Sequence, residues 1–265
     1  MRPDAITPLT FGMLVFDEVE VLDLGGPFEV FSTAGRLART DEGEPLLRVL
    51  TVAPADKLVR ARGGLQVTAD HTLNEDPSFD VLVIPGGVTT AVEADADVID
   101  WLARRRQTSA LTFSICTGAF LLAATGALNG RRATTHWEDQ EELARRWPDI
   151  HVHTDVRWVD DGDIVTSAGI SAGIDASLYI VGRIFGEQLA RRTAHQMEYV
   201  WAADRTGELA DYRVVSIQKQ LVVFCKQGGY GGDHTSYETS RNCRCAPGFD
   251  SEAAGCFLQA GWLWW

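Results

Sequence analysis

Short apolar runs alternate along this chain with longer segments in which apolar residues recur at helical spacing. The runs are rich in β-branched and aromatic residues and end at Gly, Pro, Asn or Asp, a pattern typical of buried strands. Such runs fall at residues 11–16, 47–53, 80–87 and 110–115, with a shorter one at 131–135. A pair of runs joined by an Asp-Gly turn spans 156–169, and residues 63–73 resemble a small hairpin.

The segments between these runs have the periodicity of amphipathic or buried helices. They span residues 25–38, 96–107, 117–128, 136–147, 171–186 and 187–201. In the first of them, Pro27 favours a position in the first helical turn, because proline has no N–H to donate. We therefore expect this helix to begin just after Asp23.

The alternation of strands with helices predicts the fold class. Most of the strands are apolar along their whole length, so both faces of the sheet should be covered by helices. We predict an α/β domain over residues 8–201, a doubly wound, flavodoxin-like three-layer sandwich with a mostly parallel central sheet. Residues 202–265 are rich in Gly, Ser and Thr with little periodicity, and we expect an irregular, poorly ordered C-terminal extension.

Composition and charge exclude several classes of protein. Of the 265 residues, 23% are charged, and the net charge of −13 argues against nucleic acid or an anionic membrane as a partner. The first residues lack the basic and apolar regions of a signal peptide, and no apolar run is long enough to span a membrane. Four of the five cysteines lie in the C-terminal extension, so no disulfide framework is expected in the main domain. These features favour a cytoplasmic protein.

Cys116 is the strongest candidate for chemistry. It follows the strand 110–115 directly and precedes the small residues Thr117, Gly118 and Ala119. This order matches a nucleophile elbow, a tight strand-to-helix turn that lifts one side chain out of the sheet. The start of the next helix should favour a thiolate there. The alternative is that Cys116 is a small buried apolar residue, as most free cysteines are.

Other polar and glycine positions follow neighbouring strands of the predicted sheet. Asp23 follows the first strand and is either an ordinary helix cap or an acid/base partner of the thiol. Gly86 and Gly87 end the strand 80–87, where they form either a plain turn or an anion pocket of backbone N–H groups. His136 either orients a substrate or has a structural role.

No metal or organic cofactor is predicted. The histidines of the main domain have no metal-ligand spacing with cysteines. Cys225, His234, Cys243, Cys245 and Cys256 lie in the extension, and their irregular spacing is only weak support for a zinc site.

The sequence resembles the ThiJ/PfpI superfamily, which is related to class I glutamine amidotransferases. The resemblance lies in "VLDLGGPFEVF", "VLVIPGG", "SICTGAFLLAATGALNGRRATTHW" and "VTSAGISAGID", in this order. Within the superfamily the chain is most similar to the isonitrile hydratase branch. The resemblance implies a lyase that converts an isocyanide to an N-substituted formamide, as well as a homodimer.

The resemblance also implies the roles of individual residues. Cys116 would be the nucleophile, Asp23 the essential acid/base and Thr117 a further catalytic residue. The residues that would bind the substrate or stabilise its developing charge are Gly86, Gly87, Gly118 and His136.

Two other functions remain open. The same domain resembles the N-terminal sensor half of AraC-type regulators, whose helix-turn-helix units are missing from this sequence. A glyoxalase-like or deglycase-like thiol enzyme is the third candidate, although such relatives usually carry glutamate where this chain has Asp23. Peptidase activity is not expected because Thr117 stands where a histidine would follow the nucleophile, and a glutaminase would need a later His-x-Glu element.

Overall fold

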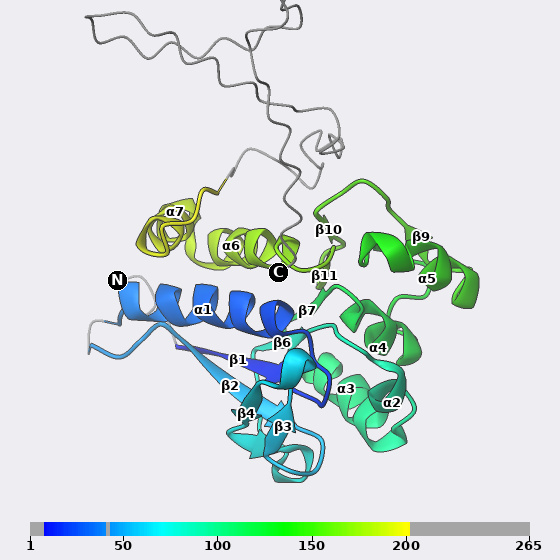
Figure 1. Ribbon diagram of the computed structural model, residues 1–265. Coiled ribbons are helices and arrows are strands. Elements are labelled where there is room, and N and C mark those ends of the chain that lie inside the picture. The colour runs from blue at the N-terminus through cyan, green and yellow to red at the C-terminus, as the bar shows by residue number, and fades with distance from the viewer. Residues whose placement is uncertain (1–7, 41–42, 202–265) are drawn as a thin grey trace, which may run out of the picture. The chain divides into compact units, whose positions relative to one another are not determined.

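A seven-stranded sheet forms the centre of the computed structural model, which describes residues 8–40 and 43–201 (Figure 1). The strand order is β10-β11-β7-β6-β1-β2-β5, and every neighbouring pair is parallel except β10 with β11. The strands are β1 Leu9–Leu14, β2 Leu47–Ala53, β5 His71–Thr72, β6 Val81–Ile84, β7 Leu111–Ile115, β10 Trp158–Asp160 and β11 Ile164–Ser167. This confirms the predicted, mostly parallel α/β fold. The predicted extension, residues 202–265, lies outside the described residues, so the domain boundary at 201 stays a prediction.

Helices cover both faces of this sheet (Figure 1). One layer contains α1 Val21–Leu37, α6 Ala172–Phe185 and α7 Glu187–Gln196. The other contains α2 Thr90–Glu93, α3 Ala96–Thr108 and α4 Gly118–Ala124, while α5 Gln140–Arg146 lies near the β10 edge. None of the helices described between residues 8 and 201 is both long enough and apolar enough to cross a membrane.

The central strands are buried on both faces, which explains why their sequences are continuous apolar runs rather than alternating ones. Phe11 of β1 pairs with Val49 on one side and with Val81 on the other. Phe11 and Phe113 are fully buried in the core. Each such side chain stabilises the fold by roughly 1.5–3 kcal/mol.

The first helix begins earlier than its sequence predicts. It starts at Val21 rather than residue 25, so Asp23 lies in its first turn and Pro27 lies inside it. Proline has no N–H to donate to the carbonyl four residues earlier in the helix. Its ring packs beside Gly173, where an added Cβ would lie 3.5 Å from Pro27 Cγ. The prediction that Asp23 precedes the helix was therefore wrong.

Other element boundaries also differ from the predictions. The helix expected at 117–128 is only α4, because the chain turns at Gly126, whose φ is +77°. The last helix ends at Gln196 instead of 201. The strand expected at 131–135 is only β8 Arg132–Ala133, and it pairs outside the main sheet with β9 His151–Val152. The strands β5 and β9 and the helix α2 are too short for periodicity to reveal.

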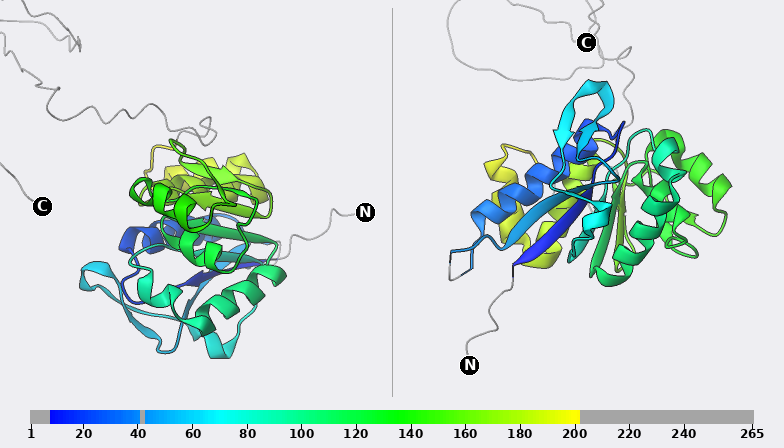
Figure 2. Two further views of the ribbon diagram at one scale, coloured as in Figure 1. Left: turned by 90° about the vertical axis from the view of Figure 1, so that its right-hand side faces the viewer. Right: turned by 90° about the horizontal axis from the view of Figure 1, so that it is seen from below.

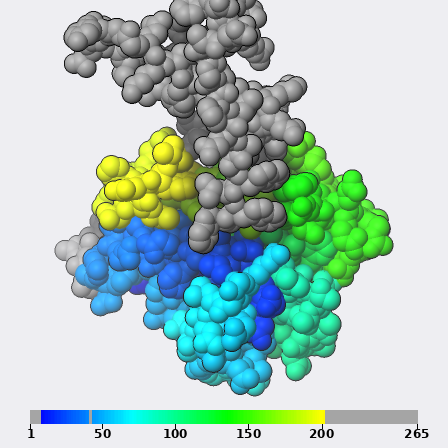
Figure 3. Space-filling view, viewed as in Figure 1, coloured from blue at the N-terminus to red at the C-terminus, as the bar shows by residue number. Residues whose placement is uncertain are grey.

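A hairpin formed by β3 Leu58–Arg60 and β4 Gln66–Thr68 protrudes from the domain (Figure 2, cyan). Its first strand, β3, lies before the predicted segment 63–73, and its second strand, β4, lies inside it. The hairpin lies against the N-terminal part of the chain (Figure 3): the Arg60 N–H donates to Asp17 Oδ1 at 2.8 Å, and the Glu18 N–H donates to the Arg60 carbonyl. It therefore supports the loop that leads from β1 into α1.

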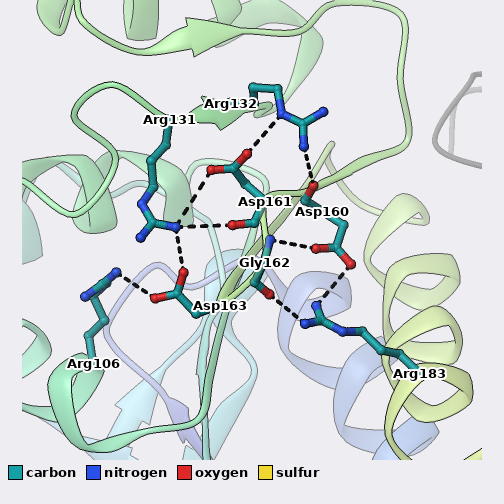
Figure 4. Close-up of polar contacts among 8 residues, drawn as sticks. All are labelled: Arg106, Arg131, Arg132, Asp160, Asp161, Gly162, Asp163 and Arg183. Atoms are coloured by element: carbon teal, nitrogen blue, oxygen red, sulfur yellow. Dashed lines mark hydrogen bonds and ion pairs between the residues drawn. The ribbon is translucent and has the colours of Figure 1, made fainter.

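An arginine–aspartate network holds the turn between β10 and β11 (Figure 4). Asp163 pairs with Arg106 at 3.0 Å and with Arg131 at 2.6 Å. Arg183 reaches Asp160 at 3.0 Å. Because β11 starts here and runs parallel to β7, the network lies at the opposite end of the sheet from Cys116.

Candidate active site

Cys116 lies in a sharp turn between β7 and α4, as the sequence predicts. Its φ of +55° is left-handed, a conformation that costs a non-glycine residue roughly 1–2 kcal/mol. Two hydrogen bonds hold the strained residue: its N–H donates to the Ser167 carbonyl at 3.0 Å, and its carbonyl accepts from Thr135 Oγ1 at 2.8 Å. The side chain is buried, with the residue only 6% exposed.

Gly118 allows the elbow to pack closely against the sheet. An added Cβ at this position would lie 2.1 Å from the Ile84 carbonyl oxygen at the end of β6. Any side chain there would push α4 away from β6 and move Cys116 with it. This geometry gives Gly118 a packing role, whereas its predicted role in binding substrate stays a prediction.

Asp23 lies beside the thiol, at the point where the strand order reverses between β1 and β6. Its side chain is fully buried, and Oδ1 accepts a hydrogen bond from the Ile170 N–H at 2.9 Å. The Cys116 thiol also interacts with this carboxyl as a hydrogen-bond donor. The second carboxyl oxygen, Asp23 Oδ2, has no hydrogen-bond donor of standard geometry among the described residues.

Burial raises the pKa of Asp23 to about 6. The hydrogen bonds from Cys116 and Ile170 act in the opposite direction, while the charge of Glu20 adds to the increase. A carboxyl with such a pKa exchanges protons near neutral pH, which suits a general acid/base.

The predicted resting thiolate was wrong. Burial raises the pKa of the Cys116 thiol, and the charge of Asp23 raises it further. The N–H of Thr117 favours the thiolate but does not outweigh these effects, and α4 is only seven residues long. At neutral pH the pair is therefore a thiol next to a carboxylate, and the thiol must lose its proton, for which Asp23 is an adjacent acceptor, before it becomes a nucleophile.

Thr117 holds the loop after β6. Its Oγ1 accepts a hydrogen bond from the Gly87 N–H at 2.8 Å and donates one to the Gly87 carbonyl at 2.8 Å. The Gly87 N–H is thus occupied and does not face a ligand. Gly86 contacts the elbow, since an added Cβ would lie 2.8 Å from Cys116 Cβ, and no described residue accepts a hydrogen bond from its N–H. The backbone donor left for a substrate in this loop is the N–H of Gly86.

The imidazole of His136 lies at the same site, next to Gly169, a residue that sequence analysis did not single out. An added Cβ at Gly169 would lie 2.2 Å from His136 Cδ2 and 3.1 Å from Cys116 Sγ. The absence of a side chain at Gly169 therefore leaves the imidazole and the sulfur facing the same space. The charge of His136 also acts on Asp23, whose pKa it lowers.

The structure thus brings Cys116, Asp23, Gly86 and His136 together and adds Gly169 and Ile170. The only sequence signal for these two was their place in "VTSAGISAGID", directly after a predicted strand. Among the described residues, no three His, Cys, Asp or Glu side chains lie where they could hold one metal ion.

Comparisons with known proteins agree with this fold. The DJ-1/PfpI family profile matches residues 11–182. Isonitrile hydratase of Pseudomonas putida is 31% identical over 72% of this chain and 78% of its own length. A crystal structure of a ThiJ/PfpI family protein from Pseudomonas syringae superimposes with a TM-score of 0.65 at 29% identity, covering 72% of this chain and 75% of the other.

The fold and the cysteine elbow define a flavodoxin-like α/β protein with its site at the carboxyl ends of the strands. The chain belongs to the DJ-1/PfpI family. The family also includes regulators: the HTH-type transcriptional regulator GbdR of Pseudomonas aeruginosa is 26% identical over 83% of this chain. This chain spans 57% of that regulator's length.

Proposed function

We propose that this protein is a cysteine-dependent hydratase that converts an isocyanide to an N-substituted formamide. The observation that carries the proposal is the buried pair of Cys116 and Asp23, in which the pKa of the carboxyl is raised to about 6. This base can accept the thiol proton at neutral pH and return it during the same reaction. The similarity to isonitrile hydratase supports the choice of substrate.

The first half of the reaction forms a covalent intermediate. Asp23 takes the thiol proton, and the Cys116 sulfur attacks the terminal carbon of R–N≡C to form a C–S bond. The same carbon then receives the proton from Asp23, which leaves the thioimidate R–N=CH–S–Cys116. The Asp23 carboxylate and its charge are thereby restored.

The second half adds one water molecule. Asp23 takes a proton from water while the oxygen bonds to the thioimidate carbon, and that proton passes to the nitrogen. The N–H groups of Gly86 and Thr117 are backbone donors beside Cys116 for charge that develops at this centre. Cleavage of the C–S bond releases R–NH–CHO, and the hydroxyl proton of the intermediate returns to the sulfur.

The test is turnover of cyclohexyl isocyanide, with N-cyclohexylformamide measured by chromatography. Cys116→Ala should reduce formation to background while leaving the thermal unfolding transition cooperative. Cys225→Ser serves as a matched control, because it removes a thiol from outside the described residues and should retain activity. Absence of product from the unaltered chain, or turnover by Cys116→Ala, would contradict the proposal.

A ligand-sensing domain is the second candidate function. It is favoured by the alignment with GbdR, which extends over 219 residues and is longer than the family match. A sensor would bind its ligand with the thiol intact, so Cys116→Ala should keep the ligand-induced rise in melting temperature, with no product formed by either chain. Methylglyoxal is tested as a second substrate, because a glyoxalase-like enzyme would convert it to lactate and a hydratase or a sensor would not.

A further inference from the structure

Two carboxylates without an arginine or lysine partner among the described residues flank the imidazole of the site. His136 Nδ1 lies 3.5 Å from Asp139 Oδ2 and 3.7 Å from Glu138 Oε2. The side chain of Asp139 is 38% exposed and that of Glu138 is 63% exposed, so both are open to solvent and to an entering molecule. By contrast, Glu142, three positions after Asp139, forms an ion pair with Arg145.

Nearby carboxylates raise the pKa values of the two reacting groups, Cys116 and Asp23. The charge of Asp139 contributes to the raised pKa of the Cys116 thiol, and Glu20 contributes to that of Asp23. In addition, Asp23 Oδ2 is buried without a standard hydrogen-bond donor from the described residues. The group of opposite charge that acts on Asp23 is the imidazole of His136, which Glu138 and Asp139 flank.

The nearby arginines are occupied. Arg62 pairs with Glu20 at 3.4 Å, and Arg157 forms an ion pair with Asp175. Neither is available to balance Glu138 and Asp139.

Exposed apolar side chains stand next in the sequence to residues of the site or of the loop after β6; these are Leu22, Val88, Trp137 and Ile170. Trp137 is the most exposed at 71%, and its ring centroid lies 5.8 Å from that of the His136 imidazole, which the two carboxylates flank. An exposed indole and carboxylates on the same imidazole are suited to an alkylammonium group, which binds both to an aromatic face and to negative charge.

We propose that the site selects isocyanides whose apolar substituent bears a protonated amine and rejects those that bear an anion. Glu138 and Asp139 are the specificity-determining residues, and Trp137 supplies the aromatic surface. This inference rests on the proposed hydratase function and adds a substrate class to it. A carboxylate on the substituent would meet like charges at the entrance, which lowers its rate of capture.

Turnover of matched substrates provides the first test. We compare 3-(dimethylamino)propyl isocyanide with n-pentyl isocyanide, and isocyanoacetate with its neutral methyl ester. At low ionic strength kcat/KM should be about tenfold higher for the amine than for the pentyl compound, and about tenfold lower for the anion than for its ester. The double variant Glu138→Gln/Asp139→Asn should bring both ratios close to one, mainly through KM.

A second double variant controls for net charge. Glu141→Gln/Asp149→Asn removes two exposed carboxylates from the same part of the chain that form no ion pair with His136. It should leave both ratios as they are in the unaltered protein. Equal ratios in the unaltered chain, or the same loss of selectivity in both double variants, would overturn the assignment of Glu138 and Asp139.

A test without turnover separates this inference from the hydratase proposal. Cys116 is modified with cationic, neutral and anionic methanethiosulfonates, and the peptide that contains Cys116 is quantified by mass spectrometry. The cationic reagent should react about tenfold faster than the anionic one, and the difference should fall with added salt. If no isocyanide is hydrated but this difference is present and is lost in Glu138→Gln/Asp139→Asn, the hydratase proposal fails and the charge selectivity stands. Equal reagent rates contradict the selectivity whatever the turnover.

Discussion

The buried carboxylate of Asp23 lowers the stability of the folded protein, and the same carboxyl is the proposed acid/base of the reaction. Its pKa in the folded protein is about 6, above the ordinary value of 3.8, so the folded state binds this proton more tightly than the unfolded state does. The stabilising effect of the protonated carboxyl is fully present below pH 3.8 and is lost as the pH rises through 6. At neutral pH the buried carboxylate therefore destabilises the fold, by up to about 3 kcal/mol.

Asp23→Asn should therefore separate stability from activity. An amide keeps an oxygen for the Ile170 N–H and carries no charge, so at pH 7.5 the free energy of unfolding in urea should rise by about 1–3 kcal/mol. This gain should shrink towards pH 4, where the native carboxyl is protonated. A variant less stable than the native protein at pH 7.5 would contradict the argument.

The same substitution should lower kcat/KM for the isocyanide by about 10²–10⁴-fold, because no group would accept the thiol proton. In the native protein, kcat/KM should increase with pH through about 6, as Asp23 ionises. A flat profile between pH 5 and 7 would exclude Asp23 as the base.

Gly169 provides the other prediction at this scale. Gly169→Ala places a methyl group 2.2 Å from His136 Cδ2, a distance that forces the imidazole out of its position. We expect kcat/KM to fall at least tenfold, with modification of Cys116 by neutral iodoacetamide slowed by the same methyl group. Gly162→Ala tests for a general effect of losing glycine, because a Cβ there meets nothing within 4 Å, although its φ of +85° adds strain. Native activity in Gly169→Ala would show that His136 takes no part in the reaction.

At the scale of elements, the turn between β10 and β11 is held by charge rather than by apolar packing (Figure 4). Burial opposes ionisation of Asp163, but its hydrogen bond and charge interaction with Arg131 lower its pKa overall. A lowered pKa means that the stabilisation is present above the unfolded pKa and is lost as the pH falls. The network contributes mainly to the position of the antiparallel edge strand.

Asp163→Asn should accordingly lower the free energy of unfolding at pH 7 by about 0.5–1 kcal/mol, since the side chain is half exposed and the interactions are screened. Chemical unfolding at low and high salt measures the effect, which should decrease with salt. Asp149→Asn, at an exposed position, is the control and should change stability little. A loss as large at high salt as at low salt would mean that the network does not act through charge.

At the scale of the whole molecule, the two ends of the sheet differ in how far their charged and polar groups are paired. At the end that carries the β10–β11 turn, Asp160, Asp161 and Asp163 are paired with arginines. The opposite end holds a strained cysteine, a buried carboxyl oxygen without a standard donor and two carboxylates without arginine or lysine partners among the described residues. Such unsatisfied groups lower stability, and they are tolerated where binding or chemistry uses them.

The sequence by itself determined the order and type of the main elements and the convergence of Cys116, Asp23 and Gly86. Apolar periodicity is a local property, and once the sheet is parallel, the residues that follow its strands must meet at one edge. The start of α1 was not predicted, because Pro27 favours a first helical turn and its packing beside Gly173 of α6, inside the helix, is a tertiary contact.

Only the tertiary structure decided the protonation of the thiol and the membership of Gly169 in the site. The pKa of Cys116 depends on how much water the whole fold excludes and on a carboxyl that lies 93 positions away in the sequence. Gly169 matters because His136 and Cys116 approach it from two other elements. Burial and close approach arise from the packing of distant segments, so no local pattern in the sequence contains them.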